Sequence, residues 1–359
     1  MTDASGAHQG TPPRRRGRLV PKLLLLGLTC VVVAAVAEIA VRPFVPMDYV
    51  GPSAVRYDAV YGRALIPGYS GVVSIPGVSY TLRVNSLGLR GPEPTGSLAG
   101  GVLCLGDSYA FGDGVSDGDE FPRLLGSALG VPVVNASLAG EGQGRWVKYL
   151  NRDAAQWSPR CVILQMCSND FRDNHEDRLF DLDAAGALVE LPVPPESTLR
   201  AIQARIESVP LLGYSRLYAL AKHAMRVATG TSRSRGTPAS PGAPNPAGIP
   251  WDDDPETSAY DDLTFVLVRE SLDRCAAAGW PVIGVVAQIE PGSRLDRILA
   301  EFDRSDAPVV VVPTKRQRPD LHHDLDGHWN ESGHRFAVDA LIPLVERALQ
   351  HASTHENAP

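Results

Sequence analysis

Residues 101–108 read Gly-Val-Leu-Cys-Leu-Gly-Asp-Ser, and the prediction of the fold begins with this stretch. The apolar run Val102–Leu105 is short and continuous, as in a strand that is buried on both faces. Gly106 and Asp107 follow it directly, then Ser108, and a glycine-rich turn comes at 112–114. The stretch therefore predicts a buried strand that presents a serine hydroxyl at its carboxyl end.

The same alternation of apolar run and turn recurs along the rest of the chain. The runs predicted as buried parallel strands are Val102–Leu105, Val131–Val134, Val162–Gln165, Val282–Ala287 and Val309–Val312. The amphipathic stretches between and after them predict helices over Glu120–Leu129, Arg145–Trp157, Ala259–Ala278, Ser293–Phe302 and Ser332–Leu349. Strand–helix alternation predicts an α/β fold, a three-layer α/β/α sandwich with a five-stranded parallel sheet. Reactive groups are then expected at the carboxyl ends of the strands.

Composition and charge exclude several classes of function. The 359-residue chain is 44% hydrophobic and 21% charged, which is ordinary for a globular protein. A net charge of −7 gives no sign of the basic face that nucleic-acid binding needs, so we expect no nucleic-acid partner. The five cysteines are scattered and none forms a C-x-x-C pair, so we expect neither a disulfide scaffold nor a cysteine-based metal or redox site.

The N-terminus carries a targeting signal. Arg14–Arg16, Arg18 and Lys22 precede an uncharged run at Leu23–Ala37, and neighbouring apolar residues extend it toward the ~20 residues that a bilayer span needs. The preceding positive charges favour a cytoplasmic N-terminus, which makes the chain a single-pass cell-membrane protein with its remainder outside. A cleavable signal peptide is the alternative, because Ala35-Val36-Ala37 fits an A-x-A site and cleavage at Ala37 would give a secreted protein. Both interpretations export the rest of the chain.

Composition also suggests the domain boundaries. Residues 1–18 are polar and basic and are predicted to be disordered, and 19–44 form the transmembrane anchor or signal segment. Residues 45–98, rich in Gly, Pro, Tyr and Val, are predicted as a small β-containing preamble. The main domain is expected over 99–352, with an insertion at 171–257 that is helical from Leu199 to Ala228 and a flexible linker at 229–250.

Ser108 is the candidate nucleophile. A serine at the end of a central strand can direct its hydroxyl into a cleft while its own backbone N–H faces an oxyanion. The hydroxyl needs a base to take its proton. The motif Gly-Asp-Ser alone is weak evidence for a nucleophile, because a serine with no chemical role is at least as common at the turn after a strand.

Two further strand ends offer hydrogen-bond donors. Gly140 closes Asn-Ala-Ser-Leu-Ala-Gly at 135–140, and a glycine lets backbone approach a ligand closely. Asn169, in Cys-Ser-Asn-Asp at 167–170, can offer its side-chain amide as an oxyanion donor. Taken singly, Gly140 could equally be a plain turn glycine and Asn169 part of an Asx-turn.

An aspartate and a histidine precede the final helix. Asp326 and His328 are two residues apart around a glycine, so the carboxylate can hold the imidazole Nδ1–H while Nε2 faces Ser108. Histidines and aspartates crowd into this stretch and could instead bind a metal: His322, His323, His328 and His334 with Asp320, Asp324 and Asp326. The spacing of these histidines is not that of H-E-x-x-H, which argues against a metal site. His334 is expected in the first turn of the last helix, where it helps to position that helix.

These four elements, in this order, resemble the signature blocks of SGNH/GDSL hydrolases. The resemblance covers roughly residues 100–350, and Asn-Ser-Leu-Gly-Leu-Arg at 85–90 resembles membrane-anchored bacterial members. It implies a flavodoxin-like sheet, Ser108 as nucleophile, Asp326 and His328 as the other triad members, and an oxyanion hole of Ser108, Gly140 and Asn169. Two blocks depart from the family pattern. Cys167 replaces the glycine of G-x-N-D, which could narrow the cleft, and D-x-H replaces D-x-x-H.

The second departure leaves an alternative open. Asp320 and His323 do match D-x-x-H, so they are a runner-up pair. D-x-H also occurs in related alginate-acetylating enzymes, which raises the prospect of acyl transfer.

The resemblance implies an exported ester hydrolase or O-acyltransferase with no metal or organic cofactor. Its expected partners are an acyl-ester substrate, for which an O-acylated glycan is one candidate, and the membrane through the N-terminal helix. The alternative is a catalytically silent carbohydrate-binding or envelope-assembly protein that keeps the fold.

Overall fold

The computed structural model describes residues 19–44, 53–228 and 260–356, and the chain forms two compact units. In the first unit, helix α1 (Leu19–Val41) is apolar on every side, and Val20–Val41 is long enough to cross a bilayer. Length and composition are equally compatible with a signal sequence. The predicted disordered tail at 1–18 lies outside the described residues.

The second unit is built on a five-stranded parallel sheet, as predicted. Its strand order is β11-β10-β7-β5-β6, with bounds β5 Val102–Gly106, β6 Val133–Asn135, β7 Cys161–Cys167, β10 Val282–Ala287 and β11 Val309–Val311. Every residue of β5 and β7 is buried, because both faces of the sheet are covered.

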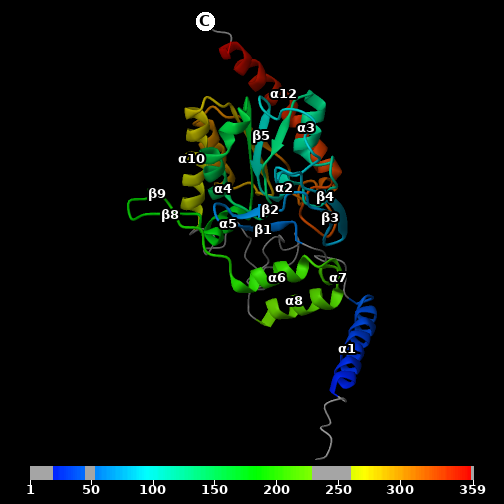
Figure 1. Ribbon diagram of the computed structural model, residues 1–359. Helices are drawn as coiled ribbons and strands as arrows, with labels where there is room; N and C mark the ends of the chain where they lie inside the picture. Colours follow the sequence, from blue (N-terminus) through cyan, green and yellow to red (C-terminus); the bar gives the residue numbers. More distant parts are fainter. Residues whose placement is uncertain (1–18, 45–52, 229–259, 357–359) are drawn as a thin grey trace, which may run out of the picture. The chain divides into compact units, whose positions relative to one another are not determined.

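Helices pack on both faces of this sheet (Figure 1). One face carries α4 (Gln143–Arg152), α10 (Asp261–Ala277) and α11 (Ser293–Asp303), and the other carries α3 (Phe121–Leu129) and α12 (Glu331–Glu356). Successive residues of a strand face opposite sides, so Leu103 packs in the first apolar layer and Cys104 in the second. The α/β/α sandwich is therefore confirmed.

One predicted helix is shorter than expected. The stretch Arg145–Trp157 is not continuous, because α4 ends at Arg152 and a separate 3-10 helix spans Ala154–Trp157. Asp153 lies between the two and accepts a hydrogen bond from the Tyr61 hydroxyl.

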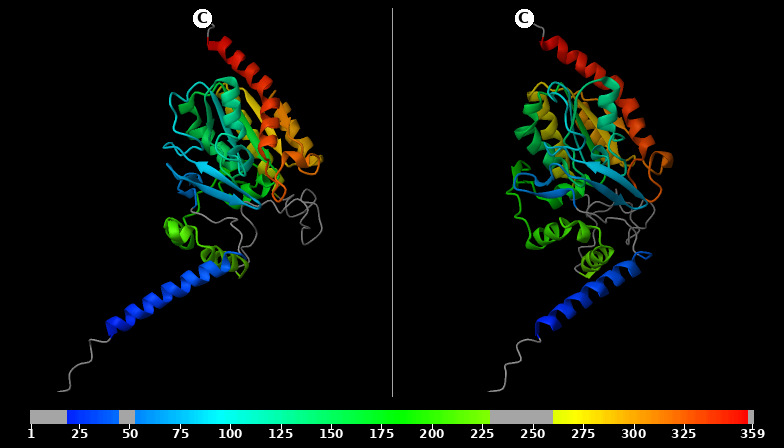
Figure 2. Two further views of the ribbon diagram at one scale, coloured as in Figure 1. Left: turned by 90° about the vertical axis from the view of Figure 1, so that its right-hand side faces the viewer. Right: turned by 45° about the vertical axis from the view of Figure 1, so that its right-hand side comes forward.

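The preamble forms two antiparallel hairpins: β1 (Val55–Asp58) with β2 (Gly62–Leu65), and β3 (Ser70–Ile75) with β4 (Val78–Arg83). Both lie beneath the large sheet, at the end away from the C-terminus (Figures 1 and 2). They share an apolar cluster with Phe111 and Leu138, which follow β5 and β6. The buried Arg90 adds hydrogen bonds of 2.6 Å to the carbonyl oxygens of Phe111, Gly112 and Val115. The preamble is thus fastened to the carboxyl ends of the strands.

The insertion contains more structure than its sequence pattern predicts. It begins within α5 (Asp170–Asp177) and continues through the hairpin of β8 (Phe180–Leu182) and β9 (Leu188–Glu190). The predicted helical stretch Leu199–Ala228 is three helices, α6 (Thr198–Glu207), α7 (Pro210–Gly213) and α8 (Arg216–Ala228). The predicted linker at 229–250 lies outside the described residues.

The cores of the second unit are self-contained. All four of its apolar clusters draw on residues from Ala54 onward, and none includes a residue of α1. A fragment that begins after α1 therefore keeps every described core contact.

Candidate active site

Ser108 begins the short helix α2 (Ser108–Phe111), directly after β5. The turn before it is fixed from the neighbouring strand, because Gln165 Oε1 accepts hydrogen bonds from the backbone N–H groups of Asp107 (3.0 Å) and Ala110 (2.9 Å). A Cβ at Gly106 would lie 2.7 Å from both the Ala110 Cβ and Gln165 Oε1, so only glycine fits there. These contacts hold Ser108, which is 6% exposed, at the carboxyl edge of the sheet.

Asp326 and His328 are joined in the loop before α12. Asp326 Oδ1 is hydrogen-bonded to His328 Nδ1 and accepts the His328 backbone N–H at 2.8 Å, and both residues are 2% exposed. An ionised carboxylate only accepts hydrogen bonds, so Nδ1 carries the proton and Nε2 is left as an acceptor. The loop is tied to the serine turn, because the Tyr109 hydroxyl donates to the Gly327 carbonyl at 3.0 Å and the Tyr109 and His328 rings lie 5.2 Å apart.

The charges around this pair shift the pKa values of both Asp326 and His328. Burial by itself lowers the pKa of His328, but the hydrogen bond and charge of Asp326, with the charges of Asp113 and Asp107, outweigh burial and raise it above its ordinary value. Burial by itself raises the pKa of Asp326, but its hydrogen bonds to His328 lower it on balance. The pair therefore has an ionised carboxylate beside an imidazole of increased basicity.

Between these described residues, the Ser108 and His328 side chains form no hydrogen bond to each other. Such a contact is often loose in a free enzyme and tightens when substrate binds. The structure brings the His328 ring against that of Tyr109, the residue next to Ser108.

The two predicted oxyanion donors meet around one carboxylate, that of Asp107. Gly140 has φ +71°, a left-handed backbone that favours glycine, and its N–H donates to Asp107 Oδ1. Asn169 Nδ2 donates to Asp107 Oδ2 at 2.6 Å and to Asp173 Oδ2 at 2.7 Å. Burial and the charge of Asp173 raise the pKa of Asp107. Asp107 was not singled out from the sequence, although it adjoins the candidate nucleophile.

Cys167, the residue that departs from the expected G-x-N-D pattern, also faces the Asp107 carboxylate. Its Sγ lies 3.1 Å from Asp107 Oδ2, 3.0 Å from Asn169 Oδ1 and 3.3 Å from Asp170 Oδ1. Burial, with the charges of Asp170 and Asp107, raises its pKa well above the ordinary value, so the side chain stays a thiol. Among the described residues, Asp107, Cys167 and Asp170 are also the one group of three or more His, Cys, Asp or Glu residues whose ligand atoms all lie within 4.8 Å of one another.

The runner-up residues are not brought together. Asp320 forms an ion pair with Arg318 at 2.7 Å and is well exposed. The His323 ring packs against Gly114. His334 is buried in α12 and its Nδ1 accepts the Phe121 N–H at 3.1 Å, which links α12 to α3.

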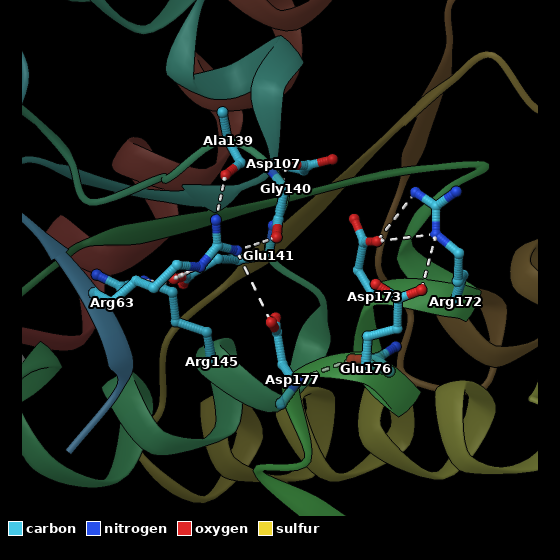
Figure 3. A network of polar contacts seen from close by, with 12 residues as sticks. Arg63, Asp107, Ala139, Gly140, Glu141, Arg145, Arg172, Asp173, Glu176 and Asp177 are labelled. Carbon is cyan, nitrogen blue, oxygen red and sulfur yellow. Dashed lines mark hydrogen bonds and ion pairs between the residues drawn. The ribbon is translucent and has the colours of Figure 1, made fainter. Parts of the chain in front are cut away.

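A network of charged residues that the sequence pattern did not indicate surrounds Gly140 (Figure 3). Arg63 of β2 donates to the carbonyl oxygens of Gly140 and Ala139 and lies 3.6 Å from Glu141. Arg145 of α4 pairs with the same Glu141 at 2.9 Å. Arg63 is 77 positions from Gly140, so no local spacing could have linked the two.

Comparisons with known proteins identify a family for the chain. A family model, the GDSL-like lipase/acylhydrolase family, matches residues 104–336. No match was found among the curated proteins.

Similar solved structures include TesA, with 13% identity, a TM-score of 0.39 and coverage of 69% of this chain and 99% of the other. A GDSL-like lipase from Bacteroides thetaiotaomicron has 12% identity and a TM-score of 0.37, with coverage of 69% and 88%. A catalytic mutant of an acetylxylan esterase from Geobacillus stearothermophilus has 12% identity and a TM-score of 0.37, with coverage of 70% and 95%. The family model spans well over half of the chain, so this protein belongs to the GDSL-like lipase/acylhydrolase family.

Proposed function

We propose that this protein is an exported serine hydrolase that cleaves or transfers the acyl group of an ester through an acyl-enzyme on Ser108. The observation that supports it best is the buried Asp326–His328 hydrogen bond, in a loop that is bonded to Tyr109 beside the serine. Together with the family, this arrangement supports a nucleophile, a base and a residue that orients the base.

The proposed chemistry has two halves. His328 Nε2 takes the hydroxyl proton as Ser108 Oγ bonds to the ester carbonyl carbon, and the carbonyl π electrons move onto oxygen. The tetrahedral intermediate then collapses, the bond to the leaving alkoxide breaks, and His328 returns the proton to it. In the second half, His328 takes a proton from water or from a sugar hydroxyl as that oxygen bonds to the acyl carbon. The bond between the acyl carbon and Ser108 Oγ then breaks, and His328 returns the proton to Ser108.

The oxyanion would be held by the backbone N–H groups of Ser108 and Gly140 and by the Asn169 amide. In the free protein, Gly140 and Asn169 both donate to Asp107, so an oxyanion has to share or replace that acceptor. Because both donors are already bonded to Asp107, this observation favours the second candidate function, a catalytically silent protein that keeps the fold.

Hydrolysis of p-nitrophenyl acetate by residues 45–359 separates these two candidates. We expect turnover by the wild type and none by Ser108→Ala with an unchanged circular dichroism spectrum. Wild-type protein that is folded and releases no nitrophenol would favour the silent protein.

We also propose that α1 anchors the protein in the cell membrane with the catalytic unit outside. Cleavage after Ala37 would instead release a secreted form. Protease added to cells with a permeabilised outer layer should degrade the catalytic unit, and a soluble species that begins at Glu38 would establish the cleaved form.

A further inference from the structure

Two consecutive peptide groups next to the candidate nucleophile lie between opposite charges. On one side, the N–H groups of Gly140 and Glu141 both donate to Asp107 Oδ1, the latter at 3.2 Å. On the other side, the carbonyl oxygens of Ala139 and Gly140 both accept from the Arg63 guanidinium. Figure 3 shows Arg63 reaching these carbonyls from its own strand.

The 139–140 peptide is the one whose N–H is a proposed oxyanion donor. A hydrogen bond to an amide carbonyl polarises the amide and strengthens its N–H as a donor, by about 10–30% per bond. Gly140 has no side chain to hold this peptide, and its positive φ is intrinsically easy to leave. Hydrogen bonds from Arg63 therefore serve both to orient this N–H and to strengthen it.

Arg63 is itself held firmly for a residue of a small hairpin. Its backbone carbonyl accepts from Arg145 at 2.9 Å, and the Arg145 guanidinium lies 4.6 Å from the Tyr61 ring centroid. The Arg63 guanidinium lies 3.6 Å from Glu141 and 3.8 Å from Asp177, and the Arg63 side chain is 21% exposed. The guanidinium is thus fixed in place before substrate arrives.

We propose that Arg63 is a positioning residue of the oxyanion hole, so that the preamble is a working part of the ester-cleaving site. The proposal rests on the function proposed above, because it assigns Arg63 a role through the Gly140 N–H. Arg63 makes no bond to substrate in this account. It keeps the peptide oriented and polarised while negative charge develops on the ester oxygen.

Arg63→Gln tests the proposal, with steady-state kinetics on p-nitrophenyl acetate. Loss of an oxyanion donor costs about 10²–10³ in rate, and loss of its support should cost less, so we expect kcat to fall about 10- to 100-fold. KM should stay within about twofold, because the ground-state ester gains little from the hole. Arg56→Gln is the matched control, since Arg56 lies on the same hairpin, is half exposed, and its guanidinium contacts Asp58 (3.4 Å) and the Tyr57 carbonyl oxygen (3.3 Å) of its own hairpin. It should retain wild-type kinetics.

A rescue experiment separates positioning from folding. In Arg63→Ala, added guanidinium at millimolar concentration should restore part of kcat, because it can donate to both carbonyl oxygens in place of the lost group. It should do nothing for Ser108→Ala, and Arg63→Lys should fall between wild type and Arg63→Gln. Thermal unfolding followed by circular dichroism reports whether each variant is folded.

The outcomes distinguish this inference from the proposed function. If wild type hydrolyses the ester, Ser108→Ala is inactive and folded Arg63→Gln matches wild type, the role of Arg63 is overturned alone. If Arg63 variants are inactive and neither guanidinium nor lysine restores activity, Arg63 is structural and the proposal is wrong. If Ser108→Ala remains active, the proposed function itself fails.

Discussion

Replacement of Asp326 by asparagine removes one charge from the candidate site and should leave the loop in place. Asp326 Oδ1 is bonded to both the ring and the backbone N–H of His328. An asparagine oxygen can still accept one of these bonds, so the fold should persist. The imidazolium that forms during proton transfer loses its neighbouring anion, and the tautomer is no longer fixed.

The expected loss is about 10⁴ in kcat, as for the equivalent change in other serine hydrolases, which corresponds to about 5.5 kcal/mol of transition-state stabilisation. The pH dependence should move as well. The base acts when neutral, so wild-type kcat/KM should rise with pH through a pKa above the ordinary 6.5 of histidine. Asp326 raises that pKa and burial lowers it, so in the variant the midpoint of the residual rate should shift to lower pH.

The assay is the pH profile of kcat/KM for p-nitrophenyl acetate, with Asp324→Asn as the matched control. Asp324 is exposed and two residues away, so its variant loses the same charge without touching His328. A loss of less than about tenfold in Asp326→Asn with an unmoved midpoint would refute the role given to Asp326.

Three other variants test separate parts of the account. Asn169→Ala should lower kcat by about 10²–10³ while a fluorophosphonate still labels the protein, since the donor acts on the transition state and the nucleophile is intact; equal kcat would remove Asn169 from the oxyanion hole. His323→Ala should keep kcat within about threefold in the same assay, and an inactive His323 variant beside an active His328→Ala would move the base to His323. Arg90→Met leaves three buried carbonyl oxygens without their donor, so urea unfolding should show a loss of about 3–5 kcal/mol, and a loss below ~1 kcal/mol would contradict the clamp that Arg90 forms.

The sheet was predictable because its signals are local. Short, continuous apolar runs bounded by turn residues, such as Val102–Leu105 and Val162–Gln165, are typical of strands that are buried on both faces of a helix-covered sheet. The helix boundary at Arg152 was not predictable, because the chain turns at Asp153, which bonds to Tyr61 of the preamble. A contact between residues 92 positions apart does not alter the local hydrophobic pattern, so the sequence does not reveal it.

The candidate site also has a part that the sequence predicted and a part that it did not. Parallel strands end at one edge, so the meeting of Gly140 and Asn169 near Ser108 follows from topology. The acceptor that joins them, Asp107, depends on side-chain direction and not on spacing. Arg63 comes from a hairpin outside the alternating pattern, and its place depends on packing between distant segments.

The central claim is that Ser108 is the residue that becomes acylated, and mapping a covalent adduct tests it most directly. Residues 45–359 are treated with a fluorophosphonate, digested and examined by mass spectrometry, with Ser108→Ala and His328→Ala in parallel. We expect one adduct, on the peptide that contains Ser108. It should be absent from Ser108→Ala and should form far more slowly in His328→Ala. An adduct on another residue, or ester turnover by protein that carries no adduct at Ser108, would contradict it.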